Sequence, residues 1–214
     1  MKKLTAAVCA MVIALSMAGC GSGDSADEAA DDTSLAMGDK ETNLENTYKL
    51  KFTSYGDIKT DRAHVDEYVE ISEKQAHSLI DNDYEAFKEA MNFDLVKELS
   101  PSREDSDVRD SFDEFRGEFE SAGITDEILS RELTNVYVQE IQLDPVGRYT
   151  YCTYGTIALV YMGESGEKGK YIEFDVGNYD EELTVFFREA RDTSKEELDE
   201  KDSYFDNFYN DSEN

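Results

Sequence analysis

Two histidines and three cysteines are the residues of this 214-residue chain best suited to acid–base or nucleophilic chemistry. His77 is followed one helical turn later by Asp81, and such a pair could work as an oriented acid and base. The same spacing is typical of a solvated contact on a helix surface, which is the interpretation we favour. His64 lies thirteen positions before His77, and this spacing matches no zinc motif.

Cys152 is the cysteine that lies farthest from the amino terminus. It falls within a tyrosine-rich run that has the composition of a β-strand. A thiol there could be a nucleophile, but a lone buried cysteine usually packs as a small apolar residue. We therefore assign no catalytic residue, and we expect no metal ion and no cofactor.

Tyrosines and charged residues of the C-terminal half are candidates for lining the mouth of a pocket. Glu173 and Arg188 would supply charge there, although Glu173 also alternates with apolar neighbours, as on the outer polar face of a sheet. The outer-face interpretation is the one we prefer. The candidate pocket-lining residues are Tyr137, Tyr151, Cys152, Tyr154, Glu173 and Arg188.

The first twenty residues have the three parts of a secretion signal. Two lysines supply the positive start, residues 4–15 the apolar run, and small residues the cleavage zone before Cys20. The apolar run is too short to cross a bilayer, which takes about 20 residues. Residues 17–20, Met-Ala-Gly-Cys, resemble the lipobox of bacterial lipoproteins. The resemblance implies cleavage ahead of Cys20 and diacylglycerol on its thiol, whereas the alternative is an ordinary signal that is cut nearby.

Charge and cysteine content narrow the functional classes. Without residues 1–19 the chain keeps 19 basic and 50 acidic residues, a formal charge of −31. Such a surface would repel nucleic acid and anionic lipid headgroups. With Cys9 removed and Cys20 acylated, Cys152 alone remains, so we expect no intrachain disulfide and a stability that depends on an apolar core.

Composition divides the chain into four segments. Residues 1–19 are the signal peptide, and residues 20–46 have the composition of a lipidated, flexible acidic linker. Residues 47–190 have the length of a single domain, and residues 191–214 form an acidic tail that contains aromatic residues. We expect these aromatics to dock, either onto the chain's own sheet or onto a partner.

Within the domain the periodicity changes from helical to strand-like. Residues 47–52 alternate as a short strand, and apolar residues then recur at three- and four-residue steps. The helical segments are residues 65–80, 84–99 and 108–122, and the later strands are residues 133–143, 149–162, 171–176 and 183–188. Short connections make the last four strands an antiparallel meander. The predicted fold class is α+β, with helices packed on a curled, cone-like four-stranded sheet.

Capping signals fix several of the predicted helix ends. Asp83 is expected to cap the second helix, and Ser102 or Ser106 the third. Gly123 is expected to end the third helix.

The order of the elements resembles the nuclear-transport-factor-like, cystatin-related α+β fold. The segment from Ala76 to Phe87 carries the resemblance, because it is similar to the helix–"gDYeaf"–helix elbow of small bacterial lipoproteins with that fold. Asn82 stands where glycine is usual, and asparagine tolerates the left-handed conformation. The superfamily includes enzymes and non-enzymes, so the resemblance implies a fold and leaves the function open.

Two functional classes therefore remain. The first, which we favour, is a membrane-anchored extracytoplasmic lipoprotein whose domain binds a small ligand or another envelope protein without catalysis. The second is a small hydrolase or isomerase with a Tyr, Asp/Glu and His pocket. A pocket filled by the chain's own side chains would favour the first class. The acidic linker and Gly21 after the lipidated cysteine fit a Gram-positive cell surface.

Overall fold

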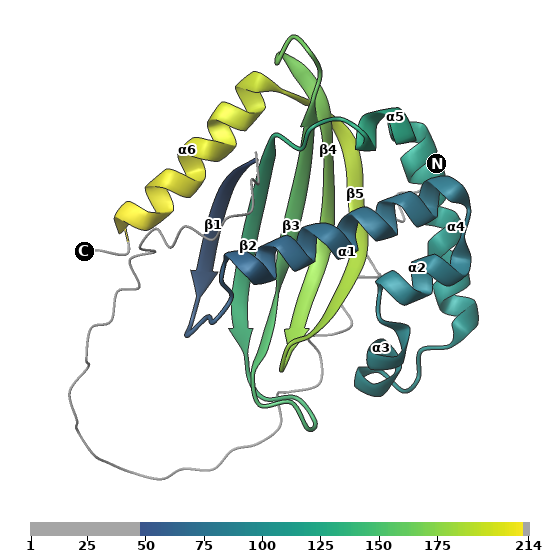
Figure 1. The fold of residues 1–214 in the computed structure, drawn as a ribbon. Helices are drawn as coiled ribbons and strands as arrows, with labels where there is room; N and C mark the ends of the chain where they lie inside the picture. Colours follow the sequence, from purple (N-terminus) through teal and green to yellow (C-terminus); the bar gives the residue numbers. More distant parts are fainter. Residues whose placement is uncertain (1–47, 212–214) are drawn as a thin grey trace, which may run out of the picture. The chain divides into compact units, whose positions relative to one another are not determined.

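The structure is a computed structural model that describes residues 48–211, with side chains through Asp206. The segments predicted to be a signal peptide and an acidic linker, together with Cys20, lie outside the described residues. The described part contains a five-stranded sheet and six helices (Figure 1). In chain order the elements are β1 Lys49–Tyr55, α1 Arg62–Asp81, α2 Tyr84–Ala90, α3 Phe93–Leu99, α4 Asp105–Ala122, α5 Asp126–Leu129, β2 Asn135–Leu143, β3 Cys152–Met162, β4 Lys168–Tyr179, β5 Glu182–Ser194 and α6 Lys195–Asp211.

The predicted α+β class is confirmed, but the predicted sheet is wrong in strand number and shape. The strands lie in the order β1-β2-β3-β4-β5, so the sheet has five strands and stays open, with β1 and β5 at its edges. The last four form the expected antiparallel meander, whereas β1 joins β2 in parallel. Parallel neighbours need a long crossover, which here contains the first five helices.

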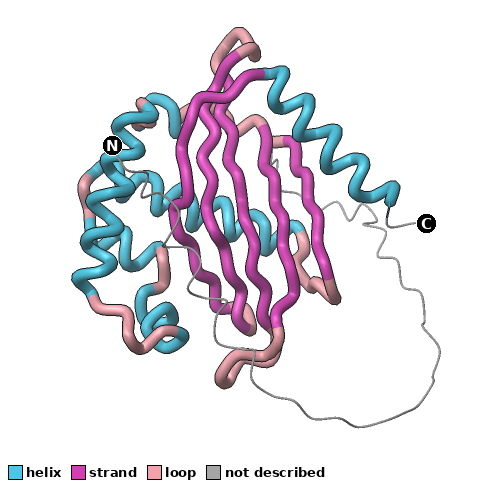
Figure 2. Tube along the Cα trace, turned by 180° about the vertical axis from the view of Figure 1, so that it is seen from behind, coloured by secondary structure: helices cyan, strands magenta, loops and turns pink. Residues whose placement is uncertain are grey.

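Alternating side chains give the sheet two buried faces. On the first face, residues such as Val138, Ile157 and Phe174 pack with α1, α2, α4 and α5 in the main core. On the second face, Tyr137, Ala158 and other residues pack under α6. Figure 2 shows that α6 starts at the end of β5 and runs to the β1 side of the sheet. Helix α6 therefore covers Ala158 and Val160 of β3 on the second face, whereas Tyr154 and Thr156 of the same strand are partly exposed.

The helix ends follow local capping chemistry. Asp83 accepts a hydrogen bond from the Ala86 amide at 3.0 Å, as expected, and Gly123 ends α4 with φ 66°. Asn82 ends α1 in the left-handed region with φ 58°. The predicted serine caps of α4 are wrong, because Glu104 is the cap and shares a capping box with Asp107.

Residues 191–211 of the predicted acidic tail form a strand end and a helix. Residues 191–194 complete β5, and residues 195–211 form α6. Phe205, only 3% exposed, docks onto the chain's own sheet, whereas Tyr204 is 52% exposed. The first of the two docking alternatives thus describes Phe205.

Candidate functional site

The second face of the sheet gathers most of the polar chemistry that strand alternation aims away from the main core. Tyr137 on β2 and Tyr171 and Glu173 on β4 point to this face, because they alternate with core residues. Helix α6 then adds Lys201 and Asp202 from above. We call these five residues the second-face cluster.

Lys201 is the central group of the second-face cluster. Its Nζ donates to the Tyr171 hydroxyl at 2.5 Å and lies 4.6 Å and 5.2 Å from the ring centres of Tyr171 and Tyr137. Burial lowers the pKa of Lys201, and the nearby Glu173 carboxylate opposes that shift. The two aromatic faces supply attraction for the ammonium group in place of part of its lost water.

The Tyr171 hydroxyl passes the hydrogen-bond chain on to Glu173. Burial raises the pKa of Tyr171, and the Glu173 carboxylate adds to the rise. Glu173 also pairs with Arg188, whose Nε lies 3.2 Å from its carboxylate, and Arg188 reaches Asp175 at 3.1 Å. Glu173, Asp175 and Arg188 therefore have charged partners within the chain.

Two apolar side chains and three ion pairs anchor α6. Leu198 and Phe205, seven residues apart on one side of the helix, are 6% and 3% exposed. The Phe205 ring lies 5.4 Å from that of Tyr137. Burying each side chain contributes about 1.5–3 kcal/mol. The ion pairs are Lys49–Asp202, Lys51–Asp206 and, at 2.5 Å, Arg191–Glu197.

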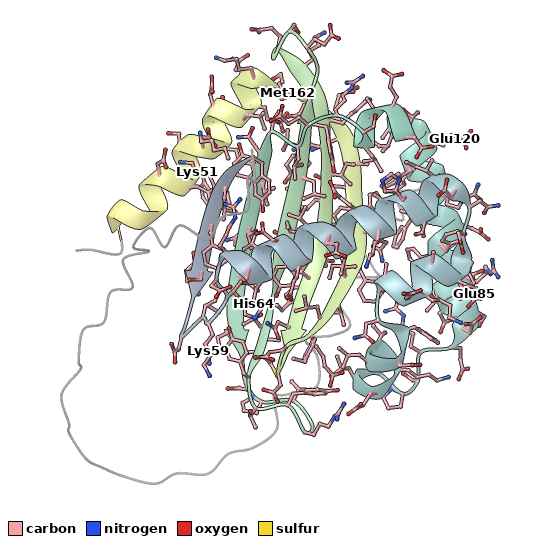
Figure 3. All side chains as sticks on the ribbon, viewed as in Figure 1. Lys51, Lys59, His64, Glu85, Glu120 and Met162 are labelled. Atoms are coloured by element: carbon pink, nitrogen blue, oxygen red, sulfur yellow. The ribbon has the colours of Figure 1, made fainter. Side chains whose placement is uncertain are left out.

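The exposed ion pairs of α6 contribute little free energy to docking, but they determine where the helix lies on the sheet. Each such pair is worth about 0–1 kcal/mol, because solvent screens it. The placement of charge is nevertheless the same in all three pairs, because the sheet contributes the cation and α6 contributes the carboxylate. Figure 3 shows Lys51 on the β1 side of the sheet, next to α6.

The structure brings four of the six predicted pocket residues to one face and separates the other two. Tyr137, Glu173 and Arg188 belong to the contacts just described, and Tyr154 lies near enough to Arg188 to contribute to its raised pKa, which burial opposes. Tyr151 accepts a hydrogen bond from the Lys59 amide at 2.7 Å. The six residues therefore do not line one pocket.

Cys152 lies in a small separate core. Its thiol is fully buried, with Leu95, Tyr149 and Tyr179 around it. Burial raises its pKa, which keeps the thiol protonated and unreactive. This agrees with the packing interpretation of the sequence.

The histidines lie on helix surfaces, away from the second-face cluster. His64 Nδ1 is 3.0 Å from Asp61, which caps α1 (Figure 3). His77 Nδ1 is 3.4 Å from Asp126 of α5, so the expected partner Asp81 is wrong. Both histidine contacts involve carboxylates that are more than two thirds exposed, so both are surface contacts; for His77 this is the kind of contact predicted, with Asp126 in place of Asp81.

Glu140, a fully buried acid between α1 and the sheet, was not predicted from the sequence. One carboxylate oxygen accepts hydrogen bonds from Tyr68 at 2.9 Å and Thr153 at 3.0 Å. No ion pair within residues 48–206 includes Glu140. Its position two residues after Val138 in an inward-facing series was the available signal.

The residue that pairs with Glu140 on β3 must be a glycine, and it is Gly155. A Cβ on Gly155 would lie 2.0 Å from the Gln139 carbonyl oxygen, so β2 and β3 approach too closely there for any side chain. The same close approach brings Thr153 within reach of Glu140. The buried acid and the glycine are therefore parts of one local arrangement.

Metal sites, surface hollows and membrane-spanning helices are the other candidate features in the described part of the chain. No group of three or more His, Cys, Asp and Glu side chains there is placed to hold a metal ion. A shallow open hollow lies over α6 and is lined by Glu167, Lys195, Glu196, Asp199, Glu200 and Ser203, none of which is a predicted pocket residue. Among residues 48–211 no helix has both the length and the apolar character needed to cross a bilayer.

Comparison with protein-family models, curated proteins and solved structures finds no match to this chain. The site must therefore be interpreted from its own geometry.

Proposed function

We propose that this protein is a lipid-anchored extracytoplasmic lipoprotein that acts as a non-catalytic interaction module. The signal-like start and the lipobox-like residues 17–20 support an anchor at Cys20. The Asn82 elbow and the order of helices and strands support a distant relationship to the nuclear-transport-factor-like fold. A Gram-positive cell surface is the location that the acidic linker supports.

The observation that carries the interaction role is that Phe205 packs onto the second face. A pocket mouth was one of two alternatives for the residues of this face, and an aromatic side chain of α6 instead lies against Tyr137. A helix that covers part of a sheet face with two apolar side chains is a binding contact made within one chain. Surfaces of this kind support recognition of other proteins through a few aromatic anchors.

The anchor is tested by replacing each cysteine separately in a bacterial host that lipidates such proteins. Full-length chain is labelled with an alkyne fatty acid, and membranes are separated from the medium. We expect Cys20→Ala to lose the label and to appear in the medium, whereas the matched Cys152→Ala variant stays labelled and membrane-bound. Label that persists in Cys20→Ala would contradict the anchor.

A further inference from the structure

We infer that α6 is an exchangeable element, and that the surface beneath it also binds α6 of a second copy of this chain. The inference deepens the interaction role proposed above, because it names the partner. It rests on the chemistry of the surface, on the small number of anchoring side chains and on the way α6 is joined to β5.

The surface beneath α6 is selective for an acidic helix. Although the whole chain carries a formal charge of −29, the sheet presents Lys49, Lys51 and Arg191 to α6. Helix α6 presents three carboxylates and two apolar side chains to this surface. The described helix that has this pattern is α6 itself: Glu197, Leu198, Asp202, Phe205 and Asp206.

Three of the five anchoring residues, Asp202, Phe205 and Asp206, lie far along α6 from its junction with β5, whereas Glu197 and Leu198 lie in its first turn. Strand β5 ends at Ser194 and α6 begins at Lys195, so no loop separates them. The ion pairs with Lys49 and Lys51 are made at the opposite edge of the sheet, on β1. A change of backbone angles at this junction would therefore move the whole helix away from its own sheet, which is the movement that exchange between copies requires.

Exchange keeps every contact of α6. In a reciprocal pair each sheet holds the α6 of its partner, with the same two apolar anchors and the same three ion pairs. The free-energy cost of exchange is the entropy that two copies lose when they associate. A two-fold pair leaves neither α6-binding surface unoccupied. Copies anchored in one membrane, as proposed above, would meet at a raised effective concentration.

The test uses charge reversal on the two sides of the contact. The first variant is Lys49→Asp/Lys51→Asp, and the second is Asp202→Lys/Asp206→Lys. Each alone places like charges between α6 and its own sheet. Mixed together, they restore attraction only if each chain takes the α6 of the other. The control carries all four substitutions, which restores attraction within a single chain.

Native mass spectrometry of the equimolar mixture gives the readout, with one variant ¹⁵N-labelled and Cys20→Ala in every chain. The salt concentration is about 0.15 M, because a Debye length of about 8 Å screens the net repulsion of the acidic chains. We expect a mixed dimer whose Kd is at least about ten-fold lower than that of either variant alone, since repulsive contacts become attractive. The fourfold variant should associate as the wild type does.

A second measurement, on wild-type chains, tests the inference even if the charge-reversal variants do not fold. Wild-type ¹⁴N and ¹⁵N chains are mixed at rising concentration, and mixed dimers are expected to appear over time. Mixed dimers in either experiment that persist after Phe205→Ala are not held by α6, and they overturn the inference. Monomers alone in both experiments also overturn it. The anchor experiment has a separate readout, so failure of either proposal is distinguishable from failure of the other.

Discussion

Phe205 of α6 lies against Tyr137 of β2, with ring centres 5.4 Å apart and ring planes inclined at 48°. These residues are separated by three strands and the whole β5–α6 junction in sequence. Their contact joins the last described helix to the second strand of the sheet, so it reports directly on whether α6 is docked.

Phe205→Ala is expected to weaken docking of α6 by about 3 kcal/mol, because the change removes a large buried aromatic side chain. The measurement is hydrogen exchange of the α6 amides in the full chain. The matched variant Tyr204→Ala removes an exposed ring from the neighbouring position and should change docking by less than about 0.5 kcal/mol. Equal protection in both variants would show that Phe205 does not anchor the helix.

Gly155→Ala is expected to destabilise the domain by at least about 3 kcal/mol, since its Cβ would collide with the backbone of β2. Urea unfolding followed by circular dichroism measures the loss. Gly117, within α4, has no atom within 4 Å of an added Cβ. Gly117→Ala should therefore stabilise the protein by about 0.5–1 kcal/mol. A mild effect of Gly155→Ala would mean that β2 and β3 are farther apart.

Asn82→Gly is expected to leave stability unchanged or slightly higher, whereas Asn82→Ala should cost about 1 kcal/mol, because φ is 58° there. Asn92 supplies the contrast. It has φ 54°, but its side chain also donates to the Leu183 carbonyl at 3.1 Å. Asn92→Gly should therefore be destabilising. Thermal unfolding of the three variants checks the order.

Stability is expected to fall as the pH rises above about 10, where tyrosines of the unfolded chain lose their protons. Burial raises the folded pKa of eight described tyrosines, five of them most strongly, so the folded state keeps protons that the unfolded state releases. The five are Tyr48, Tyr68, Tyr137, Tyr161 and Tyr171. Their contribution is fully present below about pH 10 and is lost toward the folded pKa values.

Lys201 opposes this trend over part of the range. Its folded pKa is lowered by burial, so the penalty for burying its charge disappears as the pH rises through that value.

Tyr68→Phe should reduce the alkaline slope of the unfolding free energy by an amount that rises toward about 1.4 kcal/mol per pH unit as the pH passes the unfolded tyrosine pKa of about 10. Urea unfolding between pH 9 and 11 measures the slope. An unchanged slope would contradict the assignment of Tyr68 as a buried, protonated group.

Local sequence patterns were sufficient to predict α1, α4, the meander and most caps. They did not predict the break at Asn92 that divides residues 84–99 into α2 and α3, and they did not predict α5 or α6 as helices. Apolar steps of three and four residues located α1 and α4, and Asp83 and Gly123 marked helix ends correctly. Pairing partners were not predictable in this way. Nothing in residues 47–52 specifies a parallel neighbour more than 80 positions away, so the position of β1 depends on tertiary packing.

The candidate site was predicted only in part, for the same reason. Alternation placed Tyr137 and Glu173 on one face, but it gave no information on which helix would cover them. The amphipathic signal of α6 was weak, because two apolar side chains seven residues apart are diluted by acids. Lys201 was missed because lysines are rarely buried, and its place between two tyrosines depends on the docked helix.

The parallel pairing of β1 bears on the order in which the fold forms. Lys49 pairs with Asn135, 86 residues farther along the chain. Its ion pair with Asp202 closes a loop of 153 residues. Contacts of such separation form late, since the entropy of closing long loops must be offset first. The first of the described strands is therefore expected to be among the last to pair, and Leu50 and Phe52 are expected to join the core at that late stage.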